Sequence, residues 1–199
     1  MNIDPVSDTG GIRFETPRLL LREHAVSDLA PLHAILSDPA VVWYLPDLCM
    51  SDPGDTQAYL ESVMQDRLFE HRERCNLAVE RRATGELIGS VGFHVIDRQE
   101  NSAHYGLGFF MRSDLWNMGY TSEAVRAALS ILFSGDGFRV TASCLGENLG
   151  SRRVLEKCGF SQEGLMAEHT LHNGQWKDCA LYGILKKEWQ DNRVSKDDA

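Results

Sequence analysis

The sequence predicts an α/β fold with a mixed, mostly antiparallel sheet of about seven strands that is flanked by about four helices. Two observations predict it. Three strand-like segments follow one another between residues 76 and 111 with only short polar turns between them, which is typical of an antiparallel meander. Beyond residue 120, helical and strand patterns alternate, which places helices against the faces of a sheet. The 199 residues are expected to form one domain over 1–199, with its core at about 12–189.

The first half of the chain carries local signals for strands and helices in turn. Ser27 is expected to cap a helix whose apolar positions run to Leu36, and Pro39 follows it. The next loop contains Trp43 and Tyr44 and is expected to act as a lid. The expected bounds are a strand at 18–22, helices at 27–36 and about 59–69, and strands at 76–80, 87–95 and 105–111.

The second half of the chain shows the alternation of helices and strands. Asn173 and Gly174 are typical of the tight turn of a β-hairpin. The polar tail from Asp191 to Ala199 is expected to fray. The expected bounds are a helix at 122–133, a strand at 139–145, a helix at 149–157, and strands at 160–170 and 176–185.

Composition and charge indicate the class of protein. An apolar fraction of 43% and a charged fraction of 25% are those of a globular domain. The net charge of −9 argues against non-specific binding to nucleic acid or to anionic membranes. The N-terminus lacks a signal pattern and no apolar run is long enough to cross a bilayer, so we expect a cytoplasmic protein. Five cysteines and seven histidines lack the spacing of metal ligands, so no metal is expected, and the oligomeric state stays open, a homodimer included.

The segment from Leu115 to Ala124 connects an expected strand to an expected helix. Gly119 lets the backbone approach a ligand closely, and the first turn of a helix leaves several N–H groups without partners inside the helix. Such a turn can hold a pyrophosphate. A single glycine before a helix is more often only a connector, and neither a Walker pattern nor a three-glycine dinucleotide motif is present.

Several motifs occur in a fixed order along the chain. They are the opening segment 16–22, the strand segment 107–111, the turn 116–124, the residues Asn148, Ser151, 154–157, Gly159, Phe160, Glu163 and Gly164, and the closing residues Asn173, Gly174, Trp176, Asp178, Tyr182 and Trp189. In this order they resemble the GNAT acetyltransferase superfamily, and within it the RimJ/RimL group of ribosomal-protein N-terminal acetyltransferases. The resemblance covers about residues 12–189. Two residues depart from the usual turn, which has Gln or Arg in place of Trp116 and Gly or Ala in place of Thr121.

The resemblance implies the GNAT fold and acetyl-CoA as the acetyl donor, with coenzyme A as product. It also implies that the strand end at 109–111 splays from the next strand, so that the pantetheine arm can bond to its backbone. The residues expected to contact the cofactor are Phe109, Phe110, Met111, Asn117, Met118, Gly119, Tyr120, Thr121, Ser122, Asn148, Ser151 and Arg153.

The catalytic residues are expected near the sulfur end of the cofactor. The resemblance implies that Ser151 protonates the leaving thiolate. Asn148 lies three residues earlier and either contacts the cofactor or only caps its helix. Cys144 fits a packed strand residue better than a nucleophile, because direct attack by the amine needs no covalent intermediate.

The general base is less sharply indicated. In the ribosomal-protein enzymes that the chain resembles, the base is thought to be a glutamate late in the strand after Phe160. Without gaps in the comparison, Thr170 occupies the position of that glutamate in this sequence. Glu168 lies two residues earlier, and strand alternation would place it on the same face, so it is the candidate. A solvated strand carboxylate is the alternative for Glu168, and Glu147, His94 or a water chain are the rival bases.

The expected function is transfer of an acetyl group to an amine, either the α-amine of a protein N-terminus or a small-molecule amine. The residues expected to bind this acceptor are Trp43, Tyr44, His94 and Trp176. The alternative is a module of GNAT fold that binds acyl-CoA for sensing or structure without turnover, which the absence of a glutamate at Thr170 motivates.

Overall fold

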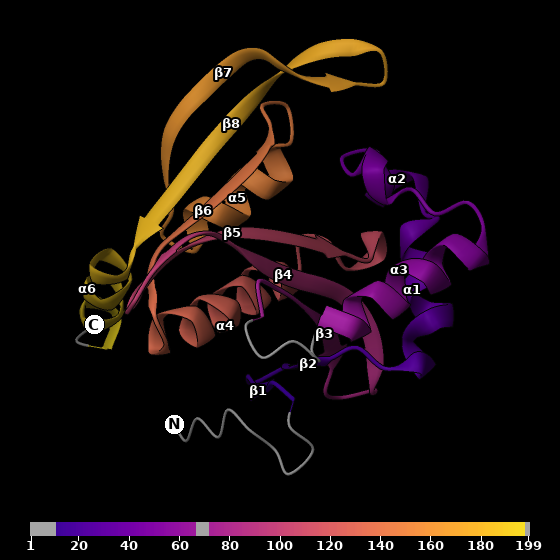
Figure 1. Cartoon of the computed structure of the whole chain (residues 1–199), viewed down its shortest axis with the longest axis horizontal. Helices are drawn as coiled ribbons and strands as arrows, with labels where there is room; N and C mark the ends of the chain where they lie inside the picture. Colours follow the sequence, from indigo (N-terminus) through magenta and orange to yellow (C-terminus); the bar gives the residue numbers. More distant parts are fainter. Residues whose placement is uncertain (1–10, 67–71, 198–199) are drawn as a thin grey trace. The chain divides into compact units, whose positions relative to one another are not determined.

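The computed structural model describes residues 11–66 and 72–197 of the chain (Figure 1). They form a mixed sheet of eight strands in the order β1-β2-β3-β4-β5-β6-β8-β7, together with six α-helices. The mixed α/β fold with a mostly antiparallel sheet is thereby confirmed, with one more strand and two more helices than expected.

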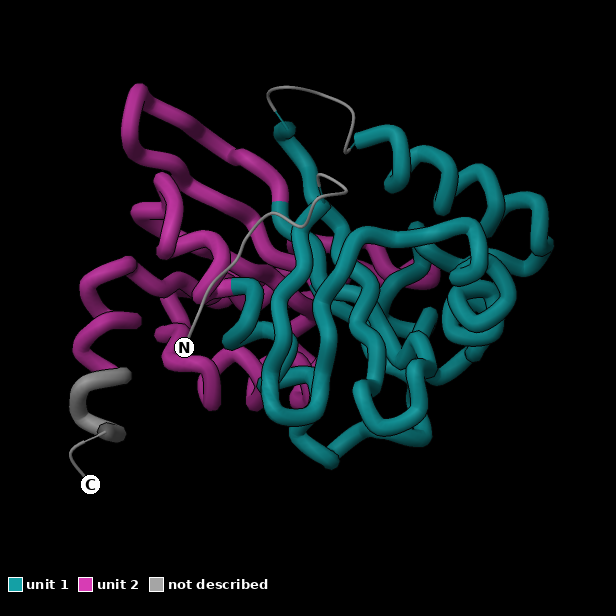
Figure 2. The backbone as a smooth tube through the Cα atoms, turned by 90° about the horizontal axis from the view of Figure 1, so that it is seen from below, with its two compact units in different colours: residues 1–93, 109–128 teal, residues 94–108, 129–199 magenta. Residues whose placement is uncertain are grey.

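The chain divides into two compact units, which Figure 2 shows in teal and magenta. Unit 1 comprises residues 1–93 and 109–128, and unit 2 comprises residues 94–108 and 129–199. Strands β4 (Glu86–Gln99) and β5 (Ser102–Met111) and helix α4 (Tyr120–Ser134) belong partly to each unit.

Unit 1 combines an antiparallel run of strands with three helices. Leu21 lies opposite Phe14 on one side and opposite Val79 on the other, which fixes the register of the first three strands. The elements confined to this unit are β1 (Arg13–Glu15), β2 (Leu19–Glu23), α1 (Leu29–Leu36), α2 (Pro39–Val42), α3 (Pro53–Asp66) and β3 (Arg74–Arg81).

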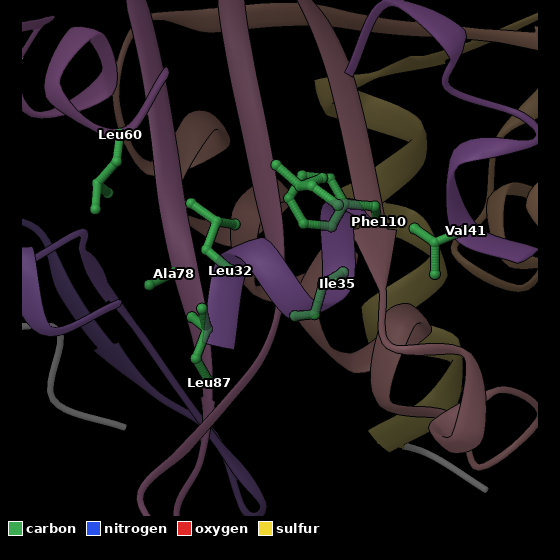
Figure 3. Close-up of a cluster of buried hydrophobic side chains, with 8 residues drawn as sticks. Leu32, Ile35, Val41, Leu60, Ala78, Leu87 and Phe110 are labelled. Atoms are coloured by element: carbon green, nitrogen blue, oxygen red, sulfur yellow. The ribbon is translucent and has the colours of Figure 1, made fainter. Parts of the chain in front are cut away.

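The apolar side chains of unit 1 gather in one cluster between its helices and strands. Figure 3 shows Leu32 and Ile35 of α1 beside Phe110 of β5, with Val41 of α2 and Leu60 of α3 nearby. Phe110 is 8% exposed and belongs to this cluster. Its side chain therefore holds the end of β5 in place, and only its backbone is available for the predicted contact with a cofactor.

Unit 2 contains a parallel pair of strands followed by an antiparallel hairpin. The pairing of β5 with β6 (Gly137–Leu145) is parallel, and its last pair, Gly106 with Thr141, lies before the end of either strand. β8 (Gln175–Leu185) pairs with β6 only between Leu185 and Cys179, whereas its pairing with β7 (Ser161–His172) runs from Gly183 to Gln175. The hairpin of β7 and β8 therefore extends past β6 (Figure 1), and its turn at 173–174 has positive φ at both residues, as expected.

Two helices complete unit 2. α5 (Leu149–Lys157) has the bounds that the sequence predicts. α6 (Lys186–Asp197) corrects the expectation of a frayed tail from Asp191, because its residues to 197 are helical. The carboxylate of Glu188 accepts the N–H of Leu185 at 2.8 Å, which caps the start of the helix, and the Trp189 ring packs 6.3 Å from that of Phe133.

Unit 1 departs from the sequence expectations at the starts of α1 and α3, and it contains an additional strand, β1. Ser27 is exposed and is not the cap of α1; the carboxylate of Asp28 instead accepts the N–H of Ala25 at 2.9 Å. α3 begins at Pro53, earlier than the expected start at about 59, and the missing N–H of a proline costs nothing at this position. β1 is too short for a periodic pattern to reveal it. The expected helix end at 68–69 lies outside the described residues.

Candidate functional site

The predicted site residues fall in both units. The strand end at 109–111, the turn at 117–122 and the lid residues Trp43 and Tyr44 belong to unit 1. Unit 2 carries His94, Asn148, Ser151, Arg153, Glu168 and Trp176.

The turn before α4 is held in a left-handed backbone conformation. Asn117 and Gly119 have φ values of 62° and 80°. The indole N–H of Trp116 donates a hydrogen bond of 2.8 Å to the carbonyl of Met111, which ties the turn to the end of β5. Trp116 thus has a direct anchoring role at the position where it departs from the usual sequence.

The donor groups of this turn fit an anionic ligand. The N–H of Glu123 bonds to the carbonyl of Gly119 at 3.1 Å, so the N–H groups before it are the first-turn donors of a 15-residue helix. The helix dipole adds partial positive charge at this end. Met118, 54% exposed, shows that the turn is open to solvent. Thr121, which replaces the usual Gly or Ala, is the second residue of α4 and so lies in its first turn.

The remaining predicted residues of unit 1 differ in exposure. Met111 is buried and Phe109 half-buried at the end of β5. Trp43 is 50% exposed just after α2, and Tyr44 beside it is half-buried. The two aromatic residues therefore lie at the surface of unit 1, where a lid residue is expected.

Unit 2 contains an open pocket of about 330 Å³ at the outer part of the β7–β8 hairpin. Glu168, Trp176 and the rival base Glu147 all line it. The structure thus brings together the predicted base Glu168 on β7, its rival Glu147 in the loop before α5, and the predicted acceptor-binding residue Trp176 on β8. The full lining is Gly146, Glu147, Arg152, Leu165, Glu168, Trp176, Lys177 and Asp178.

Glu168 occupies a β-bulge rather than a regular strand position. Met166 lies opposite Cys179 and Thr170 opposite Lys177, so residues 167–169 of β7 face a single residue of β8. Glu168 has a φ of 46°. The alternation that would place Glu168 and Thr170 on one face is therefore interrupted, and that step of the prediction was wrong. Glu168 lines the pocket because the bulge redirects it.

The pocket carries more acidic than basic side chains. Three carboxylates line it, those of Glu147, Glu168 and Asp178, against the two basic residues Arg152 and Lys177. Lys177 pairs with Glu147 at 3.1 Å. With Leu165 and the exposed Trp176 on its wall, the pocket suits a cation that has an apolar portion.

Arg152 fastens helix α5 to the hairpin. Its guanidinium donates to the carbonyl of Gly146 at 3.0 Å, to the hydroxyl of Tyr182 at 3.1 Å and to the side chain of Gln162 at 3.0 Å. Sequence reasoning missed this role, and it considered Asp178 only as part of the closing motif. The available signal in the sequence was their position, because Arg152 lies near the start of the expected helix at 149–157 and Asp178 near the start of the expected strand at 176–185.

The other predicted residues of unit 2 lie outside the lining of this pocket. Oδ1 of Asn148 accepts the N–H of Ser151 at 3.0 Å, so Asn148 caps α5, which is the second of its two predicted roles. Ser151 is half-buried and Arg153 is exposed on the same helix. The imidazole of His94 lies over Gly106, where a Cβ would be 2.3 Å from the ring.

Cys144 has the environment of a packed residue. Burial raises the pKa of its thiol to about 11, so the thiol stays protonated at neutral pH and is a poor nucleophile. Among residues 11–66 and 72–197, no group of three or more His, Cys, Asp or Glu side chains could hold a metal ion. No helix in the described ranges is long and apolar enough to span a membrane.

Comparison with known proteins connects these features to a family. A model of the acetyltransferase (GNAT) domain matches residues 18–161. The chain is 30% identical over 174 residues to the uncharacterized N-acetyltransferase YoaA of Bacillus subtilis, which covers 87% of this chain and 96% of YoaA. It is 28% identical over 109 residues to the ribosomal protein uS5-alanine N-acetyltransferase of Escherichia coli, covering 54% of this chain and 56% of that enzyme.

A solved structure agrees with this match. The GNAT-family acetyltransferase from Bacillus anthracis is 28% identical, covers 88% of this chain and 99% of its own, and has a TM-score of 0.77. The family match extends over the end of β5, the turn before α4 and all of α5. The chain therefore belongs to the acetyltransferase (GNAT) domain family and is an acetyl-CoA-dependent N-acetyltransferase.

Proposed function

We propose that the chain transfers the acetyl group of acetyl-CoA to a cationic amine, and that the acidic pocket of unit 2 binds this acceptor. The observation that carries the proposal is the meeting of Glu168, Glu147 and Trp176 in one pocket. An ammonium group is attracted by the carboxylates, and an aromatic wall adds a cation–π and apolar contact.

Glu168 is the general base of the proposed reaction. An α-amine has a pKa of about 8 and a lysine amine of about 10.4, so the amine arrives protonated and must lose its proton before attack. Glu168 takes this proton, directly or through a water molecule. The amine nitrogen then forms a bond to the acetyl carbon, and the bond between that carbon and sulfur breaks.

The cofactor contacts follow from the family and the donor groups described above. The N–H groups of the turn at 117–122 hold the pyrophosphate, and the backbone of 109–111 holds the pantetheine arm. The hydroxyl of Ser151 gives its proton to the leaving thiolate and regains one from the acceptor nitrogen, which loses its second proton as the amide forms; Arg153 contributes positive charge. Bound acetyl-CoA supplies the activated acetyl group.

The acceptor is either the α-amine of a protein N-terminus or a small-molecule amine. By its name, the relative from Escherichia coli is an alanine N-acetyltransferase of ribosomal protein uS5, which supports the first class. Three carboxylates against two basic side chains leave one net negative charge in the pocket, which suits the single positive charge of the reacting ammonium group in either class.

The deciding experiment measures free thiol released from acetyl-CoA with N-terminal peptides, polyamines and amino sugars, and identifies the product by mass spectrometry. Glu168→Gln is expected to reduce the rate by roughly 10²-fold or more. Glu61→Gln is the matched control, because Glu61 is an exposed glutamate of α3 bonded to Gln57 at 2.8 Å. Tight coenzyme A binding without transfer to any amine would favour the binding module and overturn the proposal.

A further inference from the structure

Arg18 makes a dense set of contacts with the turn before α4, all within unit 1. Its Nη1 donates to the carbonyl of Met118 at 3.0 Å, and its guanidinium lies 4.4 Å from the ring centroid of Tyr120. Its Nε donates to Oε2 of Glu123 at 2.6 Å, and its backbone N–H to Oε1 at 3.0 Å. One side chain therefore touches the turn, the first residue of the helix and the first-turn carboxylate.

The bond to Met118 fixes the direction of a donor group. The peptide between Met118 and Gly119 is planar and trans, so its C=O and N–H point in opposite directions. Since Arg18 holds the carbonyl, the Gly119 N–H is directed away from the guanidinium. Gly119 has φ 80°, a conformation that glycine adopts freely, so the peptide would otherwise be easy to reorient.

The bonds to Glu123 neutralise a charge that would oppose an anion. Glu123 lies in the first turn of α4, where first-turn N–H groups would also meet a phosphate. Burial would raise the pKa of Glu123, but hydrogen bonds from Thr16 and Arg18 lower it below its usual value, so the side chain is ionised at neutral pH. Without Arg18, a negative charge would stand beside the anion site.

We propose that Arg18 is a positioning residue of the cofactor site, which orients the Gly119 N–H and neutralises Glu123 so that the turn accepts the pyrophosphate of coenzyme A. The inference rests on the family's use of acetyl-CoA, and it is independent of the acceptor assigned to the pocket in unit 2. Arg18 acts on the site through Met118 and Glu123, which engage its Nη1 and its Nε.

The first test is the affinity for coenzyme A, measured by calorimetry without any acceptor. Arg18→Ala is expected to weaken binding roughly tenfold. Arg72→Ala is the matched control, because Arg72 makes a comparable two-bond pair with Glu23 in unit 1, at 2.6 and 2.9 Å. Its affinity for coenzyme A should equal that of the wild type. Unchanged affinity in Arg18→Ala, or an equal loss in Arg72→Ala, would overturn the proposal.

A second test separates positioning from general support of the fold. S-acetylpantetheine carries the thioester but lacks the pyrophosphate. Arg18→Ala should lower kcat/KM for acetyl-CoA by the same roughly tenfold factor through KM, while kcat/KM for S-acetylpantetheine stays unchanged. An equal loss with both thioesters means that Arg18 only supports the fold. Failure of the acceptor proposal would leave the calorimetric result intact, so the two failures are distinguishable.

Arg18→Lys tests the orienting bond. Lysine keeps the positive charge, but a single ammonium group does not reproduce the fork that joins Glu123 to the Met118 carbonyl. The lysine variant should therefore regain only part of the affinity for coenzyme A. Full recovery would show that charge alone matters and would overturn the orienting role.

Discussion

The backbone N–H of Glu168 donates a hydrogen bond of 2.9 Å to Oδ1 of Asp178. This bond lies across the bulge in β7, and Asp178 is the residue that the bulge faces. A glutamate with φ 46° is unusual, because left-handed backbone costs a side-chain-bearing residue about 1–2 kcal/mol. The strain is retained at a residue that lines the acidic pocket, which is a pattern typical of functional positions.

Glu168→Gly separates the backbone role of this residue from its side-chain role. Glycine adopts φ 46° freely, so the variant should be as stable as the wild type or more stable, by up to about 1 kcal/mol. The acetyl-transfer rate should nevertheless fall by roughly 10²-fold or more, because the proposed base is gone. Thermal unfolding and kcat/KM measure the two effects. A fully active glycine variant would mean that the Glu168 side chain is not the base and that residue 168 serves only the backbone of the bulge.

Asp178 is expected to act through Glu168. Asp178→Ala removes the acceptor of the Glu168 N–H and should lower kcat more than it raises the KM for the amine. Asp178→Asn keeps an oxygen that can accept this bond, so it should recover most of kcat. Steady-state kinetics on both variants checks that kcat falls further in Asp178→Ala than in Asp178→Asn. Equal losses in the two variants would point to the charge of Asp178 and away from its hydrogen bond.

Trp116 should matter for cofactor binding through its indole N–H. Trp116→Phe keeps an aromatic ring but leaves the Met111 carbonyl without this donor. Losing one such bond costs about 1 kcal/mol, so the dissociation constant for coenzyme A should rise about fivefold. Calorimetry on Trp116→Phe beside Trp176→Phe provides the comparison, since Trp176 lines only the pocket of unit 2. Equal affinity in the two variants would contradict an anchoring role.

Local signals predict the regular elements of this chain well. Helix α5 has the expected bounds because an N-cap asparagine precedes it and Gly159 follows it. The hairpin turn at 173–174 follows from the preference of Asn-Gly for positive φ at both positions. These features depend on residues close together in sequence.

Features that depend on a partner segment were not predictable in the same way. The bulge at 167–169 exists only relative to the register of β8, so alternation within β7 does not determine the direction of Glu168. Phe110 is buried because it packs against residues of helices α1–α3, which lie far from it in the sequence. The contacts of Arg18 with the turn near Gly119 likewise join residues about a hundred positions apart.

Asp28 is expected to make the stability of the protein depend on acid pH. Its side chain is 3% exposed and bonds to both terminal nitrogens of Arg22 at 2.8 Å. Burial would raise the pKa of Asp28, but hydrogen bonds from Arg22, His24 and the Ala25 N–H hold it well below its usual range. A carboxyl whose pKa is lowered on folding stabilises the native state above its unfolded pKa of about 3.9, and this contribution is lost as the pH falls further.

Asp28→Asn removes one charge of the buried pair and should lower the free energy of unfolding by about 1–3 kcal/mol at pH 7, because the hydrogen bonds from Arg22 lose their charged acceptor while Arg22 keeps its pair with Glu80 at 2.8 Å. Urea unfolding of the wild type and of Asp28→Asn at pH 7, 5, 4 and 3 measures the difference in the free energy of unfolding. The difference from the wild type should shrink below about pH 4, since the wild-type carboxyl then begins to lose its advantage. Asp114→Asn is the control, because Asp114 pairs with Arg112 at an exposed site and its loss should change stability little. A difference that stays constant down to pH 3 would mean that Asp28 stabilises the fold through packing and not through its charge.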